Sequence, residues 1–313
     1  MNPLDRAAEK AVKHSLQLKK GEHFLLISDR QKMEIAERFA YWAKRAGAET
    51  TTFLITETLR PITGPTELFR AMAEKATAMA YMLDARIEEK PFRAYMVKVS
   101  RNHNRICMMP GITVDMMERL VNIDFERLDA FTRTVKDALE GAEEVHIENP
   151  EGTNITFSVK GRRWQLDTGD ISQKGMHGNL PAGECFTAPV EKTFTGKLVI
   201  SLIDDKLGTG VMEFHEGKLV DYSGKGLGEV VANIGDDPTG LIVGEFGIGT
   251  NPNARICPNM LEAEKSFGTV HFAIGDSYGL GMNSSVHHYD ALVDKVTIFA
   301  NGRYIAKEGK FLL

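Results

Sequence analysis

The chain has 313 residues and a formal net charge of −5, with acidic and basic residues interspersed along its length. This length suggests two domains with a sizeable core, and the lack of a basic run argues against a nucleic-acid partner. No stretch approaches the ~18 apolar residues of a membrane span, and residues 1–7 lack the apolar core of a signal peptide, so we expect a cytoplasmic protein without a membrane partner.

The first half of the chain alternates strands with helices. Apolar and β-branched runs predict strands at 23–28, 51–56, 79–83 and 105–109. Helical spacing of apolar residues predicts helices at 31–46, 65–78, 113–121 and 125–139. This order predicts an α/β N-terminal domain with an open, mainly parallel sheet and flanking helices.

The second half is dominated by short strands joined by turns. Strands are expected on either side of the turn at 149–152, of the turn at 216–217, and of Asn301-Gly302, a strong hairpin signal. A helix is expected near 226–232. We therefore predict a domain boundary near Gly141, with an α/β domain over 1–141 and a β-rich α+β domain over 142–313 that carries a metal site.

Five side chains that can bind metal ions lie in the last 130 residues: Glu184, Glu245, His271, His288 and Asp290. Two imidazoles and three carboxylates provide the ligands that one or two divalent cations require. Taken singly, such a residue is more often a structural or solvated group. Their spacing alone therefore leaves both interpretations open.

Strand alternation predicts the face of the strand on which each of these side chains lies. In 269–274, His271 is expected on the face opposite to the apolar residues at 270, 272 and 274. His288 and Asp290 are two residues apart, so an extended backbone places both on one face and His287 on the other. We therefore select His288 rather than His287 as the ligand.

The segments around these residues resemble the aminopeptidase T / aminopeptidase S family of metallo-aminopeptidases. The resemblance is carried by residues 151–157, 179–189, 244–252, 264–275, 277–278, 281–283 and 288–290. It extends over roughly the last half of the chain, whereas the first half matches only in its general β/α pattern. The family is similar in fold to 2,5-dihydroxypyridine 5,6-dioxygenase.

The resemblance implies a hydrolase that releases N-terminal amino acids from peptides by metal-activated water. It implies two divalent cations per chain, which would be zinc, cobalt or manganese, and a homodimer. Glu184 and Glu245 stand at the family's metal-binding glutamates, and His271, His288 and Asp290 at the remaining ligands. Tyr278 stands at a tyrosine expected to act in catalysis. Either glutamate could bridge the cations while the other serves as general base.

Two alternatives remain at this point. In the first, His271, His288 and Asp290 bind a single Fe(II) in a ring-cleaving dioxygenase acting on a small aromatic molecule. His103 could then supply an acid–base group from the first domain, although a histidine in a surface loop is the simpler interpretation. In the second, the chain binds metal or peptide without catalysis.

Overall fold

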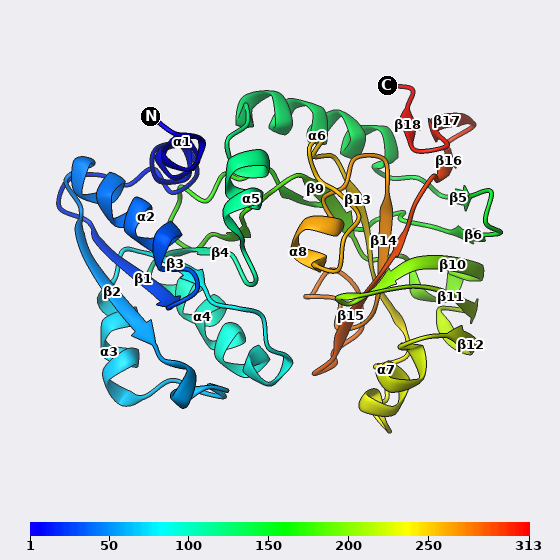
Figure 1. Ribbon diagram of the computed structural model, residues 1–313. Helices are drawn as coiled ribbons and strands as arrows, with labels where there is room; N and C mark the ends of the chain where they lie inside the picture. Colours follow the sequence, from blue (N-terminus) through cyan, green and yellow to red (C-terminus); the bar gives the residue numbers. More distant parts are fainter. The chain divides into compact units, whose positions relative to one another are not determined.

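The computed structural model describes residues 1–313, apart from the side chain of Leu207, and separates into two compact units (Figure 1). Unit 1 comprises Met1–Phe125 and Asp167–Ala182. Unit 2 comprises Glu126–Leu166 and Gly183–Leu313. The contacts thus divide the chain at residue 125, and a later segment returns to unit 1. The division into separate domains at 1–141 and 142–313 stays a prediction.

Unit 1 contains the predicted parallel sheet. Its strands are β1 (His23–Asp29), β2 (Glu49–Ile55), β3 (Ala78–Met82), β4 (Arg105–Met108) and β8 (His177–Asn179), in the order β2-β1-β3-β4-β8. All of the pairings are parallel. β1, β3 and β4 are apolar along most of their length because both faces of a parallel sheet are covered. β8 belongs to the segment that returns from the second half of the chain.

Helices cover the sheet of unit 1. They are α1 (Pro3–Lys10), α2 (Met33–Arg45), α3 (Glu67–Lys75), α4 (Lys90–His103) and α5 (Val114–Met116), with short π- and 3₁₀-helical turns between them. α3 begins where the Thr66 side chain accepts a hydrogen bond from the backbone N–H of Phe69. Phe69 of α3 and Phe92 of α4 pack against β1, β3 and β4, whereas α2 lies across the sheet from them (Figure 1). Helices α1 and α4 were not predicted from the sequence.

Unit 2 is built on a large antiparallel sheet, as expected for a β-rich domain. Its strand order is β18-β17-β16-β5-β6-β10-β15-β14-β13-β9-β7, and β11 and β12 extend from β10. The strands are β5 (Val145–Glu148), β6 (Asn154–Phe157), β7 (Gln165–Asp167), β9 (Glu184–Thr187), β10 (Thr195–Ile203), β11 (Lys206–His215), β12 (Lys218–Gly224), β13 (Val243–Gly249), β14 (Val270–Gly275), β15 (His288–Val293), β16 (Thr297–Ala300), β17 (Arg303–Lys307) and β18 (Lys310–Phe311). The predicted hairpins at 216–217 and at Asn301-Gly302 are confirmed.

The core of unit 2 fixes which way the central strands face. Phe157, Phe194, Phe246 and Phe272 form an aromatic cluster, in which the rings of Phe246 and Phe272 stack at 5.3 Å between centroids. The helices α6 (Phe125–Leu139) and α7 (Leu227–Ile234) add buried apolar side chains to this core, and the short α8 (Met260–Ala263) precedes β14. Since Phe246 and Phe272 point into the core, their neighbours Glu245 and His271 point to the opposite face.

Among the described residues, no helix combines the length and the apolar character needed to cross a membrane.

Candidate metal centre

Four neighbouring strands of unit 2 carry the five side chains singled out in the sequence. Glu184 opens β9, Glu245 lies in β13, His271 lies in β14, and His288 and Asp290 lie in β15. These strands are adjacent in the order β15-β14-β13-β9. The fold therefore brings together residues that are more than 100 positions apart in the chain.

The five side chains form one connected cluster. Nε2 of His271 lies 3.3 Å from Oε2 of Glu184 and 3.2 Å from Oε1 of Glu245. Nε2 of His288 lies 3.9 Å from Oε2 of Glu245 and 3.3 Å from Oδ1 of Asp290. Glu245 thus approaches both imidazoles, one with each carboxylate oxygen. The cluster gives the geometry of a site, while the roles of its members as ligands or catalysts stay predictions.

Gly247 makes room for the imidazole of His271. The two residues are paired across β13 and β14. A Cβ atom added to Gly247 would lie 2.0 Å from Nε2 of His271 and 2.2 Å from its Cε1, far inside van der Waals contact. The imidazole therefore occupies the space that a side chain of β13 would otherwise fill.

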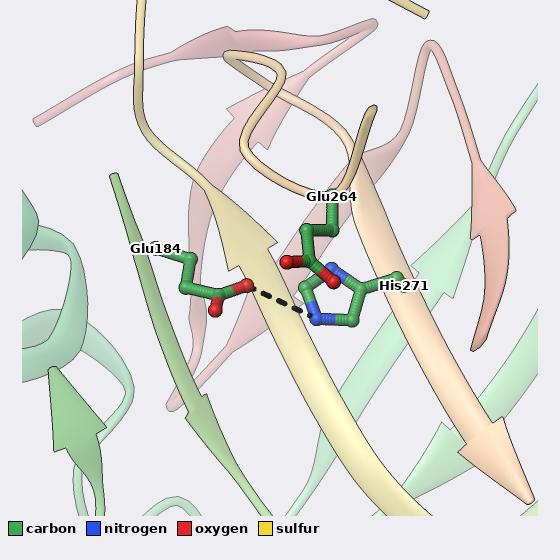
Figure 2. Close-up of side chains that lie close together, drawn as sticks. All are labelled: Glu184, Glu264 and His271. Atoms are coloured by element: carbon green, nitrogen blue, oxygen red, sulfur yellow. Dashed lines mark ion pairs between the residues drawn. The ribbon is translucent and has the colours of Figure 1, made fainter. Parts of the chain in front are cut away.

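Sequence analysis missed two members of the cluster, Glu264 and Lys265. Glu264 directly follows α8, and its carboxylate lies close to Glu184 and His271 (Figure 2). The buried ammonium of Lys265 forms ion pairs with Oε1 of Glu184 and, at 2.8 Å, with Oε1 of Glu264. Both residues open the segment 264–275 that carried the family resemblance. They lie before the strand, where no alternation indicates a direction for the side chain.

The acidic and imidazole groups separate into two sets that can each hold a metal ion. Within the first set, Glu184, Glu264 and His271, one ligand atom per residue lies within 4.8 Å of the others. The same holds for the second set, Glu245, His288 and Asp290. We call them the Glu264 set and the Asp290 set. Carboxylate oxygens with an imidazole nitrogen suit zinc, manganese, cobalt or ferrous iron, so the donor chemistry fits a divalent cation in each set.

The surrounding carboxylates raise the pKa values of both imidazoles. Burial by itself lowers the pKa of His271, but the hydrogen bond to Glu245 and the charges of the nearby carboxylates outweigh it and raise the pKa to about 9. Burial likewise lowers the pKa of His288, but the carboxylates of Asp290 and Glu245 outweigh it and raise the pKa to about 10. Without a metal ion, both side chains therefore hold a proton at neutral pH. The cluster favours positive charge.

Backbone contacts orient His288 within the site. Its Nδ1 donates a hydrogen bond to the carbonyl of Asp276 at 2.9 Å, so Nε2 points toward the carboxylates. The ring of the neighbouring His287 instead stacks at 6.0 Å on Tyr289. The extended segment predicted here is confirmed as β15, and it presents His288 and Asp290 to the same cluster.

Tyr278 lies at the edge of the cluster, in the loop between β14 and β15. Its ring centroid is 4.5 Å from that of His288, and the residue is 54% exposed. The carboxylate of Glu191 accepts a hydrogen bond at 2.7 Å from the backbone of Met282, farther along the same loop. The ring of Tyr278 therefore packs against the imidazole of His288 and remains partly exposed. His103, by contrast, is the exposed last residue of α4 in unit 1.

Comparisons with known proteins identify relatives of the chain. The sequence profile of the family described as thermophilic metalloprotease (M29) matches residues 121–302. No curated protein sequence gives a significant match. The structure of 2,5-dihydroxypyridine dioxygenase from Pseudomonas putida is similar at a TM-score of 0.77 and 15% identity, over 100% of this chain and 98% of that one. AmpT from Thermus thermophilus is similar at a TM-score of 0.76 and 17% identity, over 99% of each chain. At these identities the likeness shows a shared fold.

Proposed function

We propose, from the premise that this chain belongs to the thermophilic metalloprotease family M29, that it is an aminopeptidase using two divalent cations. The observation that carries the proposal is the position of Glu245 between the two sets. One of its oxygens approaches His271 of the Glu264 set and the other approaches His288 of its own set. A carboxylate in this position suits a bridge between two cations. The structural similarity to AmpT supports the same activity class.

All six residues of the two sets belong to unit 2. Glu184, Glu264 and His271 would hold one cation, and Glu245, His288 and Asp290 the other. When bound, divalent cations supply Lewis acidity, which makes water a stronger acid and polarises the scissile carbonyl. The four carboxylates of the two sets would balance the charge of two divalent cations.

The protein side chains have separate tasks in this proposal. Glu245, which has one oxygen toward each imidazole, would serve both sets, and Glu184 would accept a proton from water. The hydroxyl of Tyr278 would donate a hydrogen bond to the oxyanion that develops on the scissile carbonyl. Loss of one such donor costs about 10²–10³ in rate in hydrolases that use this device.

Metal analysis combined with hydrolysis of an aminoacyl-anilide tests the proposal. We expect two zinc, cobalt or manganese ions per chain, turnover that chelation abolishes, and recovery of turnover when metal is returned. The matched control is the same anilide with an acetylated amino group, which an aminopeptidase should leave intact. One iron per chain with no hydrolysis would overturn the proposal and favour a ring-cleaving dioxygenase.

The homodimer that the family resemblance implies is part of the proposal. Light scattering on the eluting protein would measure the mass, and a monomer at micromolar concentration would contradict this part alone.

A further inference from the structure

The loop between β14 and β15, residues 276–287, carries Tyr278 in an unusual backbone conformation. Its φ of 51° lies in the left-handed region, which a residue with a bulky side chain rarely adopts. Such a conformation persists only where surrounding contacts hold it in place. The contacts of the loop therefore indicate what keeps the ring of Tyr278 beside the imidazole of His288.

A first anchor fixes the base of this loop. The side-chain nitrogen of the buried Asn283 lies within hydrogen-bond distance of three backbone carbonyls, among them that of Val243 at 2.8 Å. The N–H of Asp276 donates to the carbonyl of His287 at 2.7 Å, which joins the two ends of the loop. The carbonyl of Asp276 in turn accepts the hydrogen bond from Nδ1 of His288. The orientation of His288 therefore rests on the base of the loop.

A second anchor holds the tip of the loop, residues 278–282. Oε1 of Glu191 accepts a hydrogen bond from the N–H of Met282 at 2.7 Å, and Oε2 pairs with Nη2 of Arg162. Nη1 of the same guanidinium donates to the carbonyl of Leu280 at 3.4 Å. Both charged side chains are largely buried, with 12% of Glu191 and 16% of Arg162 exposed. We call this ion pair the Glu191 clamp.

The clamp joins the tip of the loop to the core of unit 2. A Cβ atom added to Gly281 would lie 2.6 Å from Oε1 of Glu191 and 2.9 Å from Cβ of Ala188, so the carboxylate approaches where the loop has no side chain. Glu191 begins a 3₁₀ turn that leads into Phe194 of the aromatic cluster. The N–H of Phe194 donates to the carbonyl of Glu191 at 3.0 Å. The carboxylate therefore extends from a fixed part of the core.

We propose that Glu191, together with Arg162, is a positioning residue for Tyr278, and that the clamp fixes the loop tip before a substrate binds. This inference rests on the proposed function in taking Tyr278 to stabilise the oxyanion. A hydrogen-bond donor that is already in place needs no rearrangement as charge develops, so loss of the clamp should slow the reaction of bound substrate. The clamp bonds to the tip of the loop, whereas His288 is oriented from the base, so Zn²⁺ binding should not change.

Steady-state hydrolysis of the aminoacyl-anilide tests the role of Glu191. Glu191→Ala should lower kcat about 10-fold or more with a smaller change in KM, because the phenol is displaced while the metal-binding sets stay in place. Glu191→Gln should recover most of this loss, since the amide oxygen can still accept from the N–H of Met282. Glu143→Ala is the matched control, because it removes an exposed glutamate paired with Lys160 in the same unit and should leave kcat unchanged.

A double variant shows whether Glu191 acts through Tyr278. Once Tyr278→Phe has removed the hydroxyl, Glu191→Ala should change kcat by less than about twofold. Calorimetric titration of each metal-free variant with Zn²⁺ should give the same two binding steps as the wild type. The positioning role would be refuted by losses that multiply in the double variant, by an unchanged kcat in Glu191→Ala, or by weaker Zn²⁺ binding in Glu191→Ala.

Hydrogen exchange separates this inference from the aminopeptidase proposal, because it needs no turnover. The amide of Met282 should exchange at least about 10-fold faster in Glu191→Ala than in the wild type, while the amide of Asp276 keeps its protection. Unchanged exchange at Met282 would show that the clamp does not hold the tip. If exchange changes as expected but the metal-loaded wild type leaves the anilide intact, the aminopeptidase proposal fails, and the clamp stands as an anchor without the catalytic consequence.

Discussion

Each unit of this protein buries a cluster of charged side chains, and the two clusters are built differently. In unit 1, the guanidinium of Arg60 lies between the carboxylates of Asp29 and Glu89. In unit 2, the four carboxylates of the two metal-binding sets share two imidazoles and the ammonium of Lys265. The two clusters differ in how the charges of their carboxylates are balanced.

The cluster of unit 1 has its hydrogen bonds satisfied within the protein. Glu89 receives Nε and Nη2 of Arg60 as a bidentate pair, at 2.9 and 2.6 Å. Asp29 accepts from Nη1 of Arg60 at 3.1 Å and from the backbone N–H groups of Lys32 and Asp84. Although burial raises the pKa of Glu89, the bonds from Arg60 and from the backbone of Ile62 outweigh it and lower the pKa. This cluster holds strands and loops together and needs no ligand.

The cluster of unit 2 has an excess of negative charge. The raised pKa values of His271 and His288 show that its carboxylates recruit protons onto both imidazoles. A divalent cation in each set would supply the positive charge that these protons supply otherwise. We conclude that the first cluster stabilises the fold and that the second is arranged for cations. The following predictions test this distinction.

The largest expected effect is on catalysis. Glu245→Gln should lower hydrolysis by at least about 10³-fold, because a carboxylate that serves both sets is lost. Above about pH 10, where both imidazoles are neutral, the metal-free variant should be as stable as the wild type or more stable, since one of four crowded carboxylates has been neutralised. Turnover and thermal unfolding of the metal-free protein provide the two readouts. A large loss of stability without metal would mean that the cluster of unit 2 stabilises the fold, as the cluster of unit 1 does.

Arg60→Met should have the opposite pattern. Removing the guanidinium leaves two buried carboxylates without their partner, which should lower the free energy of unfolding by about 3–5 kcal/mol. Denaturant unfolding measures the loss, and the folded fraction should bind Zn²⁺ as the wild type does. The double change Arg60→Met with Glu89→Gln should recover part of the stability. If the single variant unfolds at the wild-type denaturant concentration, the stabilising role of this cluster is wrong.

The stability of the metal-free protein should fall as the pH rises. The pKa values of His271 and His288 are raised from an ordinary value of 6.5 to about 9 and about 10. A raised histidine pKa contributes its full stability below about pH 6.5, and this contribution is lost as the pH passes through the folded-state value. Unfolding between pH 6.5 and 10 should therefore become easier without metal. The slope should flatten at saturating Zn²⁺, because metal-bound imidazoles carry no titrating proton; an equal slope would count against these ligands.

The smallest effect is expected for His287→Ala. His287 stacks on Tyr289, whereas His288 approaches Glu245 and Asp290. His287→Ala should change hydrolysis and Zn²⁺ affinity by less than about threefold, while His288→Ala should remove one calorimetric step. Equal losses in the two variants would mean that His287 belongs to the site and that our assignment is wrong.

Strand periodicity is the part of the site that the sequence predicted well. It selected His288 with Asp290, and it placed His271 opposite the apolar residues of β14, because side chains on a strand can point in only two directions. The same reasoning could not find Glu264 and Lys265, which lie between α8 and β14. Their side-chain directions depend on how that connection packs, and this is a tertiary property.

The grouping of the ligands was also beyond the sequence. The sequence did not divide the five residues between two ions, and the structure groups His271 with Glu184 and Glu264. Pairing of β9 with β13 brings Glu184 next to β14, and no local pattern encodes this long-range contact. For the fold, the pattern of strands and helices predicted a mainly parallel sheet in the first half of the chain and a β-rich domain in the second. It could not anticipate that β8, from beyond residue 141, joins the sheet of unit 1.

Because Gly247 has no side chain, a single substitution at this position would disrupt the site. A single methyl group there would overlap the imidazole of His271, since its carbon would lie 2.0 Å from Nε2. Gly247→Ala would thus displace one ligand while leaving every ligand in the sequence. A chain with an intact set of metal-binding residues could then be a non-enzyme. In searching for active members among divergent sequences, the small residue opposite the histidine is as informative as the histidine itself.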